Sequence, residues 1–68
     1  MSITLKAARI NSGLTQAQAA EKLGISTNTL QKYEAGITFP NIKMIRKIES
    51  VYDVEYNDIS FILPKNEN

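Results

Sequence analysis

Apolar residues recur along this chain with a helical period, and small polar residues and glycines interrupt the pattern at short intervals. The densest set of these signals lies in residues 14–36, LTQAQAAEKLGISTNTLQKYEAG. Thr15 is a good helix N-cap, and Gln18 stands three residues later, where a capping box has Glu or Gln. Gly24 allows a sharp turn, and Ser26 after it is a second N-cap. The pattern predicts two short helices joined by a tight glycine turn.

Similar signals divide the rest of the chain into further short helices. We expect five helices, at about residues 4–12, 16–23, 27–35, 42–52 and 56–60, with Glu55 as the cap of the last one. The residues expected to face the core from the first and fourth helices are Leu5, Ala8, Ile10, Ile42, Ile45, Ile48 and Tyr52. Helices this short cannot each bury a face alone, so they must share one core. The predicted fold class is all-α, a compact five-helix domain at residues 1–63 followed by a polar tail at 64–68.

The second and third predicted helices must cross steeply because only a short turn separates them, and this is the helix-turn-helix arrangement. Leu30 and Tyr33 have the spacing of an inward face on the third helix. The opposite arc has no large apolar residue and consists of Thr27, Asn28, Gln31 and Lys32. The sequence thus predicts a small polar helix face that is presented to a partner.

The composition narrows the possible functions. A chain of 68 residues allows one small domain of marginal stability, which favours dimerisation as a supplement. The chain has no Cys and no His, so it lacks thiolate chemistry, the usual zinc ligands and the commonest general base. No segment resembles a targeting peptide or a membrane span. We expect a cytoplasmic protein that is not an enzyme and that uses no metal, cofactor, membrane or small-molecule substrate.

The net charge of +1 conceals an asymmetry between the two parts of the chain. Residues 1–47 contain seven basic residues and two acidic ones, whereas residues 48–68 contain five acidic residues and one basic one. One interpretation is that the charges are scattered over a solvated surface. The other is that a basic half meets a polyanion, with Lys43 among its candidate phosphate contacts, and that an acidic half faces away.

With RINSG ahead of it and P-x-I-x-x-I behind it, the stretch at 14–36 resembles the helix-turn-helix family of lambdoid phage repressor and Cro proteins, the XRE family. The resemblance covers about residues 5–59. It implies a lambda-repressor-like domain whose third helix enters the major groove of DNA while the second lies across the backbone. It also implies binding as a two-fold dimer to a palindromic operator.

The resemblance implies roles for individual residues. The residues that match its base-reading positions are Thr27, Asn28 and Lys32, and Gln16 matches a glutamine that contacts phosphate or the first base. Apart from the resemblance, Gln31 is a weaker base-reading candidate, and Ser26, Thr38 and Lys43 are further phosphate candidates. Arg9 and Glu34 match a partly buried ion pair between the first and third helices. Basic residues often follow the third helix in this family, whereas this chain has Ile37, Thr38 and Phe39 there.

The apolar residues near the end of the chain exceed what a small monomer needs. We expect Tyr56, Phe61 and Ile62 to form a homodimer interface, with a self-packed tail as the alternative. The predicted function is a sequence-specific regulator that binds double-stranded DNA, of the Cro-like repressor type. A restriction-modification controller and an antitoxin-type autorepressor stay open as alternatives. A protein-interaction adaptor would need an apolar third helix, and a nuclease would need carboxylates clustered near the DNA face.

Overall fold

Polar capping residues begin the four α-helices in the described part of the chain. The computed structural model describes residues 2–61, and its helices are α1 (Leu5–Asn11), α2 (Gln16–Leu23), α3 (Thr27–Glu34) and α4 (Ile42–Tyr52). The side chains that accept a hydrogen bond from a first-turn backbone N–H are those of Thr4, Thr15, Ser26 and Asn41. The bounds of α2 and α4 agree with the predicted ranges, and those of α1 and α3 differ only at terminal residues.

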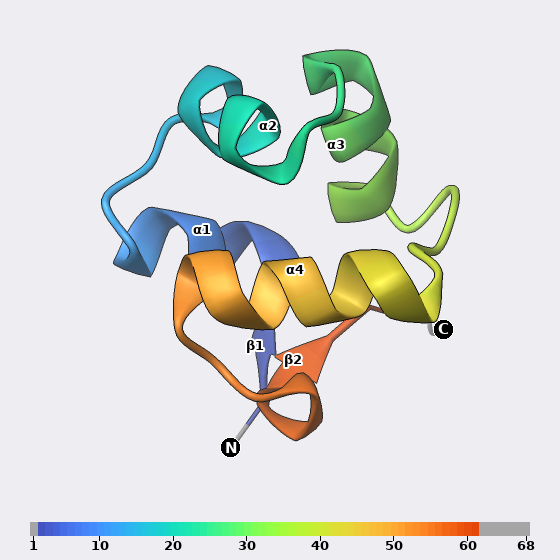
Figure 1. The fold of residues 1–68 in the computed structure, drawn as a ribbon. Helices are drawn as coiled ribbons and strands as arrows, with labels where there is room; N and C mark the ends of the chain where they lie inside the picture. Colours follow the sequence, from blue (N-terminus) through green and yellow to red (C-terminus); the bar gives the residue numbers. More distant parts are fainter. Residues whose placement is uncertain (1, 62–68) are drawn as a thin grey trace.

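The helices α2 and α3 lie on one side of α1 and α4 (Figure 1). The hydrophobic core of the described residues is made of Leu5, Ala8, Ala19, Ala20, Leu23, Leu30, Ile48, Tyr52 and Ile59. Ala19 and Ala20 of α2 are buried, whereas Ala17 is exposed, and α2 contacts both α3 and α4. Small side chains at those positions let the backbones approach closely, so that this eight-residue helix is held on two sides.

The prediction of a fifth helix at residues 56–60 is wrong. Tyr56–Asp58 forms a single 3₁₀ turn, and Ile59–Ser60 forms strand β2, which pairs in parallel with strand β1 (Ile3–Thr4). In this register Ile3 lies opposite Ile59 and Thr4 opposite Ser60. Backbone groups that pair with β1 cannot also close a helical turn. The described residues therefore form four α-helices, one 3₁₀ turn and a two-residue strand pair, so the fold is mostly helical as predicted, but the count of five helices is not confirmed.

The predicted cap of that last helix is also wrong. Glu55 makes no side-chain capping hydrogen bond. Instead, Glu49 Oε2 on α4 accepts a hydrogen bond from the backbone N–H of Tyr56 at 2.8 Å. This contact holds the 3₁₀ turn against α4.

Two isoleucines that were expected to face the core are exposed. Ile10 is 55% exposed and Ile42 is 73% exposed. At 3.6 residues per turn, Ile42 lies about 120° around α4 from the buried Ile48, and Ile10 lies about 140° around α1 from the buried Leu5. The residue that continues the buried line of α4 is Tyr52, four positions after Ile48.

Residues 62–68 lie outside the described part of the chain, so the domain boundary expected after residue 63 stays a prediction. Within residues 2–61, no helix is long and apolar enough to cross a membrane.

Candidate nucleic-acid interface

The turn between α2 and α3 has the local structure that its sequence predicts. At the start of α2, Gln18 N donates to Thr15 Oγ1 at 3.1 Å and Thr15 N donates to Gln18 Oε1 at 2.9 Å, which completes a capping box. Gly24 ends α2 with a φ of +75°, a left-handed conformation that favours glycine. Ser26 Oγ then accepts a hydrogen bond from Thr29 N at 3.1 Å and caps α3. The predicted caps and turn are confirmed.

One face of α3 is polar and open to solvent. Leu30 is buried and Tyr33 is half-buried on the inner side. The exposed residues of the outer side, called the α3 arc below, are Thr27, Asn28, Gln31 and Lys32. The structure thus brings all four candidate base-reading residues to one solvent-facing surface.

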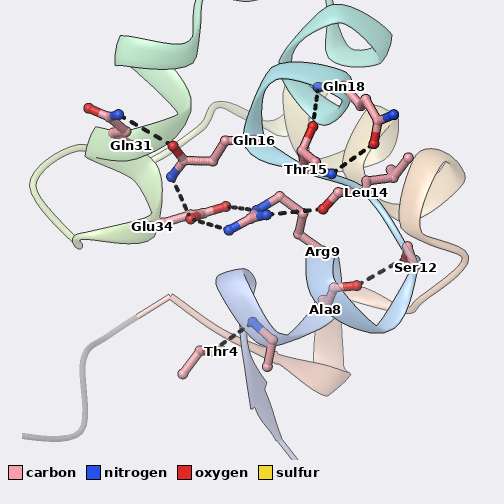
Figure 2. Close-up of polar contacts among 11 residues, drawn as sticks. Thr4, Ala8, Arg9, Ser12, Leu14, Thr15, Gln16, Gln18, Gln31 and Glu34 are labelled. Carbon is pink, nitrogen blue, oxygen red and sulfur yellow. Dashed lines mark hydrogen bonds and ion pairs between the residues drawn. The ribbon is translucent and has the colours of Figure 1, made fainter.

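Behind the α3 arc, polar side chains from three helices form a connected set of hydrogen bonds (Figure 2). Arg9 donates through Nε to Glu34 Oε2 at 2.7 Å and through Nη2 to Glu34 Oε1 at 3.4 Å. Its Nη1 donates to the Leu14 carbonyl oxygen at 3.0 Å. Glu34 Oε1 also accepts from Gln16 Nε2 at 3.0 Å, and Gln16 Oε1 accepts from Gln31 Nε2 at 3.3 Å. This set joins α1, the start of α2 and the α3 arc.

The ion pair in this set is almost completely removed from solvent. The side chains of Arg9 and Glu34, which the sequence expects to pair, are 9% and 6% exposed. Charges this deeply buried are tolerated only when they are paired and hydrogen-bonded, and both conditions hold here. The pair therefore fixes the position of α3 relative to α1.

Tyr52 on α4 lies close enough to this pair for both charges to act on its hydroxyl. Burial is the main cause that raises the pKa of Tyr52 to about 12; the negative charge of Glu34 adds to the shift and Arg9 opposes it. Tyr52 Oη is buried and has no hydrogen-bond partner among the described residues. The hydroxyl is neutral near pH 7, so Tyr52 contributes packing and not charge beside the ion pair.

The last turn of α3 closes with a Schellman-type hydrogen bond. Ile37 N donates to the Lys32 carbonyl oxygen at 3.0 Å across Gly36, whose φ is +75°. Thr38 follows in the exposed loop, and Lys43 is exposed in the first turn of α4. These two candidate phosphate contacts thus lie on the surface, outside the α3 arc.

Aromatic and aliphatic side chains gather on a second surface, between the loop after α3, α4 and the 3₁₀ turn. The Phe61 ring stacks on Tyr56 with centroids 5.8 Å apart and meets Phe39 in a T-shaped contact at 6.5 Å. Phe39 is 64% exposed and Tyr56 is 50% exposed. Ile45 and Tyr56 line two adjoining hollows, one of which contains Phe39 and Phe61 and the other Ile42. These five residues are called the Phe39–Phe61 surface below.

Sequence reasoning missed two features of these surfaces. The bonds from Gln16 to Glu34 and Gln31 depend on how three helices are placed, and no local spacing reveals them. The second missed feature is the exposed aromatic surface around Phe39. Its signal in the sequence was an aromatic residue in a loop, where no helical period requires an apolar side chain. Ile62, which the sequence expects in a dimer interface, lies outside the described residues.

The crossing pair α2 and α3, with its capping box and glycine turn, corresponds to a known family. A family model described as Helix-turn-helix matches residues 5–59. This chain belongs to that helix-turn-helix family. The prediction of an XRE-type member is confirmed.

Among curated proteins, this chain is 38% identical over 63 residues to the HTH-type transcriptional regulator ImmR of Bacillus subtilis (strain 168). The aligned part is 93% of this chain and 47% of ImmR, so the chain spans about half the length of that relative. No solved structure gives a significant match.

Proposed function

We propose that this helix-turn-helix protein is a sequence-specific transcriptional regulator that reads double-stranded DNA through α3. The observation that carries the proposal is the polar, exposed α3 arc on the outer side of the α2–α3 unit. Asn28 has the chemistry to pair with adenine N6 and N7, and Thr27 can offer a hydroxyl or a methyl group to a base edge. Lys32 suits guanine O6 and N7 or a phosphate. Amide, hydroxyl and ammonium side chains of these types discriminate between base edges in a major groove.

Contacts to the DNA backbone would hold this arc in register. Gln16 is the first residue of α2, where free backbone N–H groups and the positive end of the helix dipole favour a phosphate. Its Nε2 uses one hydrogen on Glu34 and keeps a second one for an outside acceptor. Ser26 Oγ already accepts the capping hydrogen bond of α3 and lies 3.0 Å from Thr29 Oγ1, so Thr38 and Lys43 are the freer phosphate candidates. Binding through such contacts weakens as salt rises.

We further propose that the protein acts as a homodimer on a palindromic operator, with the two α3 helices about 34 Å apart. The Phe39–Phe61 surface supports this, because a domain this small leaves few large apolar residues exposed together without a partner. A two-fold interface must complement itself. Arg46 and Glu49 line the same hollow as Ile42 with opposite charges, so each copy could place its arginine beside the glutamate of the other.

Occupancy of an operator by such a dimer would exclude RNA polymerase, as expected of a Cro-like repressor. A restriction-modification controller or an antitoxin-type autorepressor would use the same DNA contacts, and the neighbouring genes distinguish these roles. The adaptor alternative is disfavoured by the polar α3 arc, since a protein-binding helix would present apolar residues there.

Selection of bound sequences from random duplex DNA tests DNA binding, sequence preference and symmetry in one experiment. We expect a palindromic consensus with half-site centres about 10 base pairs apart. Retention of random and selected duplexes with equal affinity at matched salt would reject the proposal of sequence-specific binding.

The dimer proposal needs a separate measurement. We expect sedimentation to give a dimer for the wild-type chain and a monomer for Ile42→Glu. In a dimer through the Phe39–Phe61 surface, the new carboxylate would be buried among apolar side chains. Ile10→Glu is the matched control, because Ile10 is another exposed isoleucine and lines neither of those hollows. A monomeric wild-type chain both free and on its operator would reject the dimer.

A further inference from the structure

The carboxylate of Glu34 sets the direction of the hydrogen bonds behind the α3 arc. An ionised carboxylate only accepts hydrogen bonds, so an amide can meet it only through its NH₂ group. Glu34 Oε1 lies 3.0 Å from the amide nitrogen of Gln16. Glu34 cannot turn toward water, because its side chain is 6% exposed and Arg9 holds its other oxygen at 2.7 Å. The Gln16 amide is therefore fixed with Nε2 toward Glu34 and Oε1 on the opposite side.

The same constraint passes from Gln16 to Gln31. Gln16 Oε1 is an acceptor, and it lies 3.3 Å from Gln31 Nε2. One N–H of Gln31 is thus directed inward, toward α2 (Figure 2). Gln31 is exposed and follows Thr27 by one helical turn, on the same arc. Its outward groups are Oε1 and the second N–H, which are one acceptor and one donor.

We propose that this directed chain of hydrogen bonds makes Gln31 an adenine-specific contact, an inference that rests on the proposed DNA-binding function. In the major groove, adenine presents the N7 acceptor and the N6 donor, and the fixed Gln31 amide complements both. Guanine presents two acceptors, N7 and O6, and would need both N–H groups of Gln31, one of which is committed to Gln16. Without the chain, the amide could turn over and present its NH₂ group outward.

The proposed orientation of the Gln31 amide gives the residues behind the α3 arc a role beyond packing. Arg9, Glu34 and Gln16 are positioning residues for this base contact: they would touch no base edge at that position, yet they decide which groups Gln31 offers. A good bidentate contact gives a preference of about 5- to 150-fold over the wrong base. We expect a preference of this size for A·T over G·C at one position in each half-site.

The test uses the operator selected by the wild-type chain and a series of duplexes with single base-pair replacements. Competition binding at fixed salt gives the ratio of affinities for A·T and G·C at each position. The variants are Gln31→Ala, Gln16→Met and, as a control, Gln18→Met. Gln16→Met keeps the length of the side chain and leaves Arg9 on Glu34, but it removes both amide contacts. Gln18 lies in the same turn of α2, and its amide bonds to Thr15 instead.

We expect Gln31→Ala to bring the A·T to G·C ratio close to one at a single position per half-site. Gln16→Met should lower the ratio at that same position, and Gln18→Met should leave it unchanged. A lost phosphate contact or a loss of stability would weaken binding to all duplexes alike and would not change this ratio.

Two results would overturn the inference and leave DNA reading by α3 intact. One is a ratio in Gln16→Met equal to that of the wild-type chain at the position that depends on Gln31. The other is a selected operator in which no position depends on Gln31. Failure of the wild-type chain to select any sequence would instead overturn the proposed function, and this inference with it.

Discussion

Replacement of Arg9 by methionine removes the positive partner of a carboxylate that is almost fully buried. Arg9 makes two hydrogen bonds to Glu34 and one to the Leu14 carbonyl oxygen; without Arg9, the Gln16 amide is the one partner that Glu34 keeps among residues 2–61. Breaking a buried pair from one side costs about 3–5 kcal/mol. At about 0.05–0.15 kcal/mol per residue, the free energy of unfolding of a 68-residue chain is about 3–10 kcal/mol. Arg9→Met should therefore remove about 30% or more of the stability of the domain.

The double variant Arg9→Met/Glu34→Met should be more stable than Arg9→Met, because it leaves no charge buried without a partner. Urea unfolding followed by circular dichroism at pH 7 measures both. Lys6→Met, an exposed basic residue on the same helix as Arg9, is the control expected to stay within about 0.5 kcal/mol of wild type. A cost for Arg9→Met below about 1 kcal/mol, as for an exposed pair, would refute this reasoning. If the double variant were destabilised by the sum of the costs of the single variants Arg9→Met and Glu34→Met, the coupling between the two residues would be refuted.

Three further substitutions test the core, the turn and the buried hydroxyl. Leu30→Ala should lower the free energy of unfolding by about 2–5 kcal/mol, because it opens a cavity at a fully buried position. Gly24→Ala should cost about 1–2 kcal/mol through its φ of +75° alone, since the new Cβ would meet only Lys47 Nζ, at 3.8 Å; a cost near zero would contradict the left-handed turn. Tyr52→Phe should change stability little at pH 7, because Tyr52 Oη has no partner among the described residues. Unfolded tyrosine ionises near pH 10.0 and folded Tyr52 near 12, so wild-type stability should be complete below pH 10 and fall as the pH rises through 12, and Tyr52→Phe should lose less over that range.

The parts of the fold that were predicted are those with a local chemical cause. The capping box of Thr15 and Gln18 and the turn at Gly24 act within a few residues, and they placed the bounds of α2 at Gln16–Leu23 as the structure has them. The pairing of β1 with β2 joins residues near the two ends of the described chain. Strands of two residues carry no period of their own, so the sequence favoured a short helix at 56–60 instead.

In the candidate site, too, some features follow from the local sequence and others depend on how the helices are placed. The exposure of Asn28 and Lys32 follows from the helical period once Leu30 is placed inside. The contact of Gln16 with Glu34 does not follow from any period, because it depends on the angle at which α2 crosses α3. Ile42 was expected inside because apolar residues recur every three or four positions along α4. Each residue turns the helix by 100°, however, and this rotation carries Ile42 away from the buried Ile48.

The most direct test of reading by α3 is the affinity of Asn28→Ala and Lys32→Ala for the selected operator, compared with wild type at the same salt. Asn57→Ala is the control, because Asn57 is an exposed asparagine in the 3₁₀ turn, away from α3. Loss of a base contact worth about 1–3 kcal/mol should weaken operator binding by about 5- to 150-fold for at least one of the two variants, while Asn57→Ala binds as wild type does. Operator affinities of both α3 variants equal to that of wild type would contradict the assignment of α3 as the helix that reads DNA.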